Sequence, residues 1–318
     1  MATKQTHAPG AKTHGPNVLA GCLPVLILFS LLWSSRAASQ AQLPLSEHVA
    51  GREFSYTVRK GDSLSSIGAR FGVGTGVLAA SNDLSTSSAL KIGQPLRVDN
   101  RHIVPNILGD GIVINIPQRM LFYFKEGRII RHFPVGLGRP AWPTPAGEFR
   151  IIEKRQDPAW HVPLSIQKEM RREGKPVETC VPPGPDNPLG KHWLGLSIGG
   201  YGIHGTNAPA SIYQFRTHGC IRAHADDIAK LFDEVVRGTP GILVYRRLLI
   251  AKAGDRIFME VHRDAYNKEP YVQDRFEATV EKFGLESMVD RPLAQDIIRK
   301  QEGIAREISR GIGAENSR

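Results

Sequence analysis

Short stretches in the middle of the chain alternate between apolar and polar residues, which is the pattern of half-buried β-strands. The runs Ile112 to Ile116 and Met120 to Phe124 come first, and a turn from Lys125 to Arg128 leads into Ile129 to Pro134. Two such runs on either side of a short turn predict a β-hairpin. Further strands are expected at Glu148 to Glu153, Leu194 to Ile198 and Ile242 to Tyr245.

Helical spacing of apolar residues is rarer in this region. It predicts one helix over Ser165 to Arg172 and another over His224 to Val236. In the second helix Asp226 and Asp227 stand in the first turn, where negative charge is favourable. We therefore expect residues 111–246 to form a mainly β, sandwich-like and mostly antiparallel domain with few helices.

Residues 55–104 show a different order of elements. The expected elements are a strand at Tyr56 to Val58, a helix with an apolar stripe of Leu64, Ile67 and Phe71, a second helix around Gly76 to Ser81 and a strand at Leu96 to Val98. Asp62 or Ser63 can cap the first helix, because short polar side chains accept hydrogen bonds from its free N–H groups. The pattern predicts a small α+β module with the order strand, helix, helix, strand.

Residues 247–318 read as a strand followed by helices. Ile257 to His262 alternates like one more strand. Val272 to Phe283 and Leu293 to Ile308 are charged and amphipathic, which is typical of helices at a protein surface. We expect these helices either to pack on the preceding domain or to carry a partner site.

Residues 1–41 have the layout of an export signal. A polar and basic lead precedes an apolar run of 16 residues from Val18 to Trp33, and small residues at Ser39 and Ala41 suit a peptidase that cuts after Ala41. The run is shorter than the roughly 20 residues that span a bilayer comfortably. We expect a periplasmic protein that is cleaved there or held in the inner membrane by an uncleaved leader, with a polar linker over residues 42–54.

Charge narrows the possible partners. The 318 residues contain 41 Lys and Arg against 31 Asp and Glu, a net charge of +10, which suits a polyanionic or membrane-proximal setting. The sequence lacks an aromatic-interleaved basic stripe, a zinc knuckle and a helix-turn-helix pattern. Nucleic acid is therefore not an expected partner.

The candidate chemistry centres on Cys220, which follows His218 and Gly219 and lies 16 residues after His204. A thiol becomes a useful nucleophile when an imidazole takes its proton, and either histidine can serve. Gly219 lets the backbone approach a substrate carbonyl, so the N–H groups of residues 218–220 are candidate donors to a developing oxyanion. A histidine before the cysteine differs from the order in papain-like proteases.

Three other roles compete for this cysteine. A lone cysteine is often a small buried apolar residue. A zinc site from His204, His218 and Cys220 lacks a fourth ligand, and the sequence has no C-x-x-C pair, so we expect no metal. In an oxidising compartment Cys220 can also pair with Cys180, which would block a nucleophile.

The stretch Thr217 to Cys220, with His204 before it, resembles the motif of the L,D-transpeptidase catalytic domain, the YkuD or ErfK family. The resemblance continues in INIPQRM at residues 114–120, PVGLGRPAWPTPAGEF at 134–149 and VPPGPDNPLG at 181–190. It implies that Cys220 is the nucleophile and His204 the base, with the ring oriented by the Gly205 carbonyl. His218 would shape the cysteine loop or help the proton leave, and no cofactor is needed.

The resemblance also suggests residues that contact substrate. The mycobacterial form of the motif has Asn two residues after the cysteine, whereas the ErfK-like branch has Arg, as Arg222 is here. Arg222 would hold a stem-peptide carboxylate or order the loop through carbonyls. Thr217 and Tyr201 are candidates beside the oxyanion, and Trp142 is a candidate for the cleft, as are Trp160 and Trp193.

Residues 55–104 resemble a LysM module, mainly through YTVRKGDSLSSI at residues 56–67 and LKIGQPLRV at 90–98. The resemblance implies binding of glycan that contains N-acetylglucosamine. The glycines between these two segments weaken the likeness, because each costs a helix about 1 kcal/mol relative to alanine. A degenerate spacer is the alternative.

Together the two resemblances imply acyl transfer on peptidoglycan. The Cys220 thiolate would attack the diamino acid carbonyl of a tetrapeptide stem and release D-Ala, leaving a thioester. The acceptor would be an amine of another stem, a lysine of an outer-membrane protein such as a lipoprotein, or water, which makes the enzyme an L,D-carboxypeptidase. A non-catalytic scaffold that binds the wall is the alternative from another class.

Overall fold

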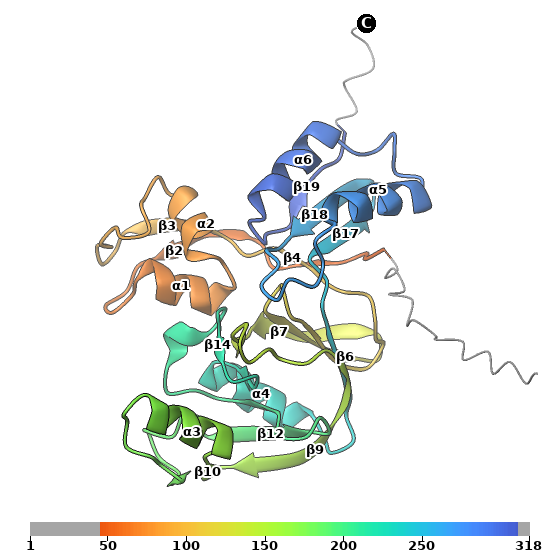
Figure 1. Cartoon of the computed structure of the whole chain (residues 1–318). Coiled ribbons are helices and arrows are strands. Elements are labelled where there is room, and N and C mark those ends of the chain that lie inside the picture. The colour runs from red at the N-terminus through yellow and green to blue at the C-terminus, as the bar shows by residue number, and fades with distance from the viewer. Residues whose placement is uncertain (1–44, 311–318) are drawn as a thin grey trace, which may run out of the picture. The chain divides into compact units, whose positions relative to one another are not determined.

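The structure is a computed structural model that describes residues 45–310 (Figure 1). The predicted leader, its cleavage point and the first three residues of the predicted linker, 42–44, lie outside the described residues. Within the described part, no helix is both long enough and apolar enough to cross a membrane.

The first module has the predicted order of elements. They are β2 (Glu53–Thr57), α1 (Leu64–Phe71), α2 (Thr75–Ala80) and β3 (Pro95–Asp99), with β2 and β3 antiparallel. Ser63 caps α1 and exchanges hydrogen bonds with Ser66, and Gly72 ends the helix in the left-handed conformation. Leu64 and Ile67 face the small core, as the apolar stripe predicts.

The central module is built on one curled sheet, which has eight strands within residues 45–310. Their order across the sheet is β15 (Ile221–Arg222), β13 (Gly202–His204), β12 (His192–Leu196), β9 (Gly147–Gln156), β16 (Pro240–Val244), β5 (Gly111–Asn115), β6 (Met120–Lys125) and β7 (Arg128–Pro134). Neighbours are antiparallel except β16 with β5 and β13 with β15. The mainly β fold class is confirmed.

Short elements surround this sheet. They are β1 (Val49–Ala50) paired with β4 (His102–Ile103), β8 (Leu137–Gly138) with β14 (Phe215–Thr217), β10 (Trp160–His161) with β11 (Cys180–Val181), the helices α3 (Leu164–Arg172) and α4 (Ala225–Glu234), and a 3-10 turn at Pro209–Ser211. The pairing of β1 means that the predicted linker is in part a strand.

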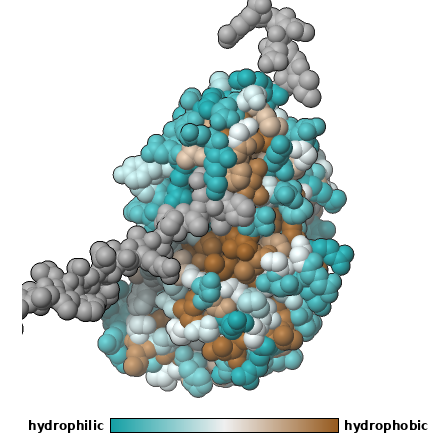
Figure 2. Space-filling model, turned by 90° about the vertical axis from the view of Figure 1, so that its right-hand side faces the viewer, coloured by the Kyte–Doolittle hydropathy of each residue, from teal (hydrophilic) through white to brown (hydrophobic). Residues whose placement is uncertain are grey.

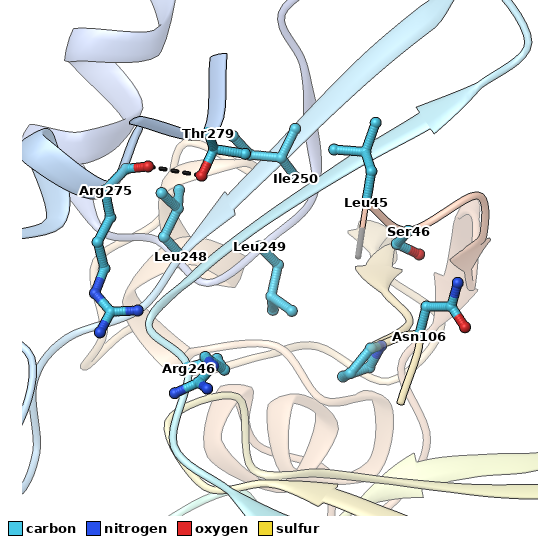
Figure 3. Close-up of a pocket in the computed structure, with 10 residues that line it drawn as sticks. Leu45, Ser46, Asn106, Arg246, Leu248, Leu249, Ile250, Arg275 and Thr279 are labelled. Atoms are coloured by element: carbon cyan, nitrogen blue, oxygen red, sulfur yellow. Dashed lines mark hydrogen bonds between the residues drawn. The ribbon is translucent and has the colours of Figure 1, made fainter. Parts of the chain in front are cut away.

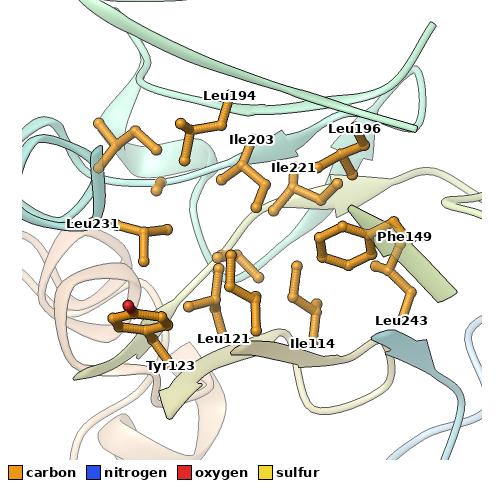
Figure 4. Close-up of a cluster of buried hydrophobic side chains, with 14 of the residues drawn as sticks. Ile114, Leu121, Tyr123, Phe149, Leu194, Leu196, Ile203, Ile221, Leu231 and Leu243 are labelled. Atoms are coloured by element: carbon orange, nitrogen blue, oxygen red, sulfur yellow. The ribbon is translucent and has the colours of Figure 1, made fainter. Parts of the chain in front are cut away.

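The core of the central module fills the curl of the sheet (Figure 4). The side chains of Leu194 and Ile203 point toward those of Leu121 and Ile114 on the other part of the sheet, and all four are fully buried. Leu231 of α4 closes one side of the cluster. Non-directional burial of apolar surface thus holds both halves of the sheet over one core.

The C-terminal module differs from its prediction. Its elements are β17 (Leu248–Ala253), β18 (Arg256–Val261), α5 (Val272–Lys282), α6 (Arg291–Lys300) and β19 (Arg306–Glu307). The helix predicted over Leu293 to Ile308 ends at Lys300, because Gln301 is left-handed with φ 50°. Beyond Lys300, Ile304 packs into the core of the first module and Ile308 packs into the core of the C-terminal module. The spacing of four residues between them therefore does not reflect one face of a helix.

The first described residues are fixed against the C-terminal module. Ser46 N–H donates to the Ile250 carbonyl at 3.2 Å, and Lys252 N–H donates back to the Ser46 carbonyl at 2.8 Å. Leu45 lies across a small cavity of about 60 Å³ from β17, and Thr279 closes the other side with a hydrogen bond to the Arg275 carbonyl (Figure 3). This segment thereby joins the edge of the C-terminal sheet.

Apolar surface is unevenly distributed. Figure 2 shows it gathered at the middle of one face, whereas polar surface predominates at the top, where the C-terminal module lies. Helices α5 and α6 turn charged residues outward and bury Phe276 and Ile297, which confirms their amphipathic pattern.

A buried carboxylate lies where the three modules meet. Glu260 of β18 is 0% exposed, and it accepts hydrogen bonds from His102 Nδ1 at 2.7 Å, His262 Nε2 at 2.8 Å and the Ile103 N–H at 2.6 Å. Gln118 Nε2 adds two contacts at 3.1 Å. Burial alone would raise the pKa of Glu260, but the attraction of His102 and these hydrogen bonds lower it to about 2.

His102 extends this network to the first module. Its Nε2 lies 2.9 Å from the carbonyl of Gly72, which can only accept. Its Nδ1 faces Glu260 at the same time. His102 therefore connects β18, β4 and the end of α1 through hydrogen bonds.

We expect Glu260→Ala to lower the free energy of unfolding by about 3–5 kcal/mol, because it leaves several buried hydrogen-bond donors without an acceptor. Chemical denaturation of the full chain measures this. Glu281→Ala, on the exposed face of α5, is the matched control and should change the value by less than about 0.5 kcal/mol. Equal effects of the two substitutions would contradict the structural role of Glu260.

Candidate active site

The pairing of β13 with β15 brings the two ends of the motif together. The strands are parallel, with Ile203 opposite Ile221 and His204 opposite Arg222. Cys220 immediately precedes β15, so it lies beside the end of β13. His204 and Cys220 line one cavity of about 370 Å³. It is also lined by Thr217, His218 and Arg222, by Arg139, Glu169, Trp160 and Leu189, and by five further residues.

His204 is held as a neutral ring. It is 3% exposed, and its Nδ1 donates to the carbonyl of Gly205 at 2.6 Å. The ring of Trp193 stacks on it with 5.9 Å between centroids. Burial and then the positive charge of Arg222 lower the pKa of His204 to about 3, although the Gly205 carbonyl opposes this. The Nε2 atom therefore carries a lone pair and can accept a proton.

Cys220 is half-buried, and its resting form is a neutral thiol. Burial raises the pKa of Cys220, while a backbone contact with Gly202 and the charge of Arg222 lower it to a smaller degree. The Sγ atom lies 3.8 Å from the carbonyl of Gly200. With His204 neutral as well, the pair is a thiol beside an imidazole rather than a thiolate beside an imidazolium. In such a pair the thiol proton moves to the base during the attack.

Thr217 ties the cysteine loop into one conformation. Its hydroxyl donates to the Cys220 carbonyl at 2.6 Å and accepts from the Gly219 N–H at 3.0 Å. The Gly219 N–H, an expected oxyanion donor, is thus already engaged. The Cys220 N–H, which was expected as a donor together with it, has no partner among the described residues and stays a candidate donor.

Position 219 requires glycine for two reasons, its left-handed backbone conformation and the lack of space for a side chain. Its φ is +107°, and a Cβ there would lie 2.5 Å from Cε1 of Tyr201. Tyr201 therefore packs against the cysteine loop. Trp142 meets the edge of His218 with 5.4 Å between ring centroids. Neither Tyr201 nor Trp142 is among the residues that line the cavity.

His218 is engaged by groups that the sequence did not indicate. Its Nε2 lies 2.5 Å from a carboxylate oxygen of Glu169 on α3, and Arg139 bonds the other oxygen. The hydrogen bonds from His218 and then Arg139 lower the pKa of Glu169 to about 2. His218 therefore has its Nε2 bonded to a carboxylate, whereas Nε2 of His204 has no hydrogen-bond partner among the described residues.

A second support lies behind the loop. The Thr144 hydroxyl donates to the Gly219 carbonyl at 2.9 Å and accepts from the Gly138 N–H at 2.9 Å. Tyr266, from the segment after β18, donates to the Gly138 carbonyl at 2.6 Å. Thr144 and Tyr266 lie 76 and 46 residues from the cysteine. Thr144 falls within the segment 134–149 that carries the resemblance, whereas no local pattern marks Tyr266.

Arg222 has one nitrogen bonded and one unpaired. Its NH1 group donates to the Ser211 hydroxyl at 3.2 Å, whereas its buried Nε has no hydrogen-bond partner in the described part of the chain. Burial lowers the pKa of Arg222, but guanidinium groups in proteins stay charged. A buried, unpaired guanidinium N–H beside the cavity can donate a hydrogen bond to an anionic group of a ligand.

Cys220 can be approached from two sides. A second hollow of about 220 Å³ also reaches it and is lined by Trp193, Gly200 and the strand residues Glu153 and Arg155. Trp160 borders both hollows. Cys220 and Trp160 thus belong to the lining of two hollows.

The other expectations concern cysteine pairing and metals. Cys180 and Cys220 are both free thiols, and Cys180 is exposed on β11. Across residues 45–310, no group of three or more His, Cys, Asp or Glu side chains is placed to hold a metal ion.

Comparisons with known proteins agree with the two resemblances. A family model of the L,D-transpeptidase catalytic domain (YkuD) matches residues 109–243, and a LysM domain model matches residues 56–99.

Two relatives and one solved structure show how far the likeness extends. The chain is 30% identical over 261 residues to the Probable L,D-transpeptidase ErfK/SrfK of Escherichia coli K12, covering 79% of this chain and 84% of the relative. It is 30% identical over 303 residues to the Salmonella typhimurium protein of the same name, covering 91% and 97%. The catalytic domain of the Enterococcus faecium L,D-transpeptidase is 22% identical with a TM-score of 0.32, covering 43% of this chain and 98% of that domain.

We expect Gly219→Ala to slow acylation of Cys220 by a carbapenem at least about tenfold, because the new methyl group meets Tyr201 at a left-handed position. Intact mass spectrometry over time measures the adduct. Gly199→Ala is the matched control, since its Cβ has no neighbour within 4 Å and its φ is not left-handed. Unchanged acylation in the Gly219 variant would show that the loop tolerates a side chain.

We expect alkylation of Cys220 by iodoacetamide to accelerate with pH and to keep accelerating beyond about pH 9, because burial raises the pKa of its thiol. The measurement uses Cys180→Ala so that only one described thiol reacts, with the Cys180→Ala, Cys220→Ala double variant as background. A thiolate–imidazolium pair would instead give a flat rate between about pH 5 and 8. Such a plateau would refute the neutral pair.

Proposed function

The chain belongs to the L,D-transpeptidase family, and we propose that Cys220 forms a thioester with a peptidoglycan stem peptide and passes the acyl group to an amine. The observation that carries this proposal is the arrangement of His204 and Cys220 in one cavity, with His204 Nδ1 bonded to Gly205. The free Nε2 is then the proton acceptor. A LysM module in the same chain supports the wall as the substrate.

In the first half-reaction, Sγ of Cys220 attacks the carbonyl carbon of the third stem residue while His204 Nε2 takes the thiol proton. The new S–C bond places negative charge on the carbonyl oxygen, toward which the Cys220 N–H can donate. Collapse of the intermediate breaks the bond to the terminal D-Ala. The His204 imidazolium returns the proton to the leaving amine, and a thioester remains.

In the second half-reaction an acceptor amine attacks the thioester carbonyl. His204 Nε2 removes a proton from the amine, the C–S bond breaks, and the departing sulfur is protonated by the imidazolium. We assign the donor stem to the larger hollow, where Arg222 offers its Nε to a stem carboxylate. The acceptor then enters from the hollow beside Trp193 and Gly200.

The remaining site residues hold the reacting groups in place and do not transfer protons. Thr217 and Gly219 set the loop, Glu169 fixes His218, and Tyr201 packs on the loop from outside. The edge-on contact of Trp142 with His218 gives it the same supporting role. The LysM module would hold the enzyme on glycan strands in the periplasm, which raises the local concentration of stems.

We expect full-length protein to release D-Ala from a disaccharide tetrapeptide, and Cys220→Ala to lower that rate by at least about 1,000-fold because no thioester forms. Coupled assay of D-Ala and mass spectrometry of the products measure this. Cys180→Ala is the matched control and should retain the rate, since Cys180 is exposed on β11.

The products decide between the acceptors. A cross-linked dimer supports transfer to a stem, a tripeptide alone indicates an L,D-carboxypeptidase, and a product formed only with an added lysine-bearing protein indicates protein anchoring. D-Ala release at the normal rate by Cys220→Ala would remove this cysteine from the reaction, and absence of release by the unaltered protein would favour a scaffold.

A further inference from the structure

Another hollow, separate from the two at Cys220, lies between the first and the C-terminal modules. It measures about 530 Å³, within the usual size range of small-ligand sites. None of its lining residues lines either hollow at Cys220. They are Gly74, Gly76, Val77 and Ala80 around α2, Arg119 between β5 and β6, and His262, Arg263, Lys300, Gln301, Glu302 and Gly303.

Positive charge predominates in this hollow. Arg119 and Arg263 form no ion pair within residues 45–310, and Lys300 lies 2.6 Å from Asp296. The one carboxylate in the lining, Glu302, already bonds Arg306 at 3.0 Å. Two cations are therefore left without a counter-charge, which favours an anionic ligand.

The Arg119 side chain is arranged in advance for such a ligand. Its guanidinium carbon lies 4.1 Å from the centroid of the Tyr213 ring and 5.2 Å from that of Phe215, so aromatic rings cover its faces. Its Nε is buried and has no hydrogen-bond partner in the described chain. The Arg119 guanidinium also faces the Tyr213 hydroxyl, where it opposes the effect of burial on the pKa of Tyr213. The two aromatic contacts hold the guanidinium at the lining of the hollow, where it can bind a carboxylate.

Several residues in or beside this hollow have strained backbone conformations. Arg119, Tyr213 and Gln301 are all left-handed, with φ of 55°, 58° and 50°. Such conformations cost about 1–3 kcal/mol each and are common at ligand sites. Gly303 is left-handed too, and a Cβ there would lie 2.8 Å from His262 Nδ1. His262 Nε2 is bonded to Glu260, so its ring is fixed behind this wall.

The small residues on the wall of the hollow opposite Arg119 favour one kind of anion, a carboxylate carried by a peptide. Gly74, Gly76 and Ala80 present almost no side chain, which lets a peptide backbone approach closely. That wall belongs to the LysM module, and stem peptides are attached to the glycan that such modules bind. We propose that this hollow binds a free carboxylate of a peptidoglycan stem peptide, with Arg119 as its main contact and Arg263 and Lys300 as flanking charges. This inference rests on the proposed function.

The test is an NMR titration of full-length Cys220→Ala with a sugar-free stem tetrapeptide, so that glycan contacts do not contribute. The amides of Gly74 and Gly303 report on this hollow, and the amide of Gly219 reports on the active site. We expect two independent saturation curves. The same peptide with its carboxylates amidated should shift Gly74 and Gly303 at least tenfold more weakly.

Two variants separate charge from shape. Arg119→Gln should weaken the Gly74 and Gly303 curves at least tenfold and leave the Gly219 curve unchanged. Gly76→Gln should do the same by filling the hollow, since a Cβ at Gly76 has no neighbour within 4 Å and no existing contact is lost. Arg128→Gln removes an equally positive but exposed side chain and should change neither curve.

Absence of shifts at Gly74 and Gly303 when Gly219 is saturated would overturn the inference, as would equal binding of the amidated peptide. Insensitivity of these shifts to both Arg119→Gln and Gly76→Gln would do so as well. These results leave the proposed reaction intact if unaltered protein still releases D-Ala through Cys220. Loss of that release, with the two Gly reporters still saturating, would refute the reaction alone.

Discussion

The parallel pairing of β13 with β15 is the constraint on which the active site depends. It places the end of one strand and the start of another at the same level, so a histidine and a cysteine 16 residues apart become neighbours. This strand pairing brings both residues to the lining of one cavity of about 370 Å³. The Thr217 hydroxyl completes this arrangement by closing the turn between them.

Electrostatics at the site follows from its burial. Burial beside Arg222 disfavours a charge on His204, and burial likewise disfavours a thiolate at Cys220. A neutral thiol reacts slowly with oxidants, because the thiolate is the reactive form. Cys220 is half-buried whereas Cys180 is exposed, although both are unpaired.

Local patterns predicted most strands, the LysM order of elements and the His204–Cys220 motif, because periodicity and short-range spacing carry that information. They did not predict the partners of the motif. Glu169 and Tyr266 reach it only through tertiary packing, and one glutamate in a charged helix looks like any other. The predicted helix beyond Lys300 was wrong for a related reason, since Ile304 and Ile308 serve two different cores.

That last feature has a bearing on how such a chain can be assembled from modules. The LysM core is completed by Ile304, which comes from about 200 residues further along the sequence. Genetic exchange of the amino-terminal module alone would therefore leave a vacancy in its interior, and trimming the tail would do the same from the opposite direction. The two ends of this protein are expected to be inherited together.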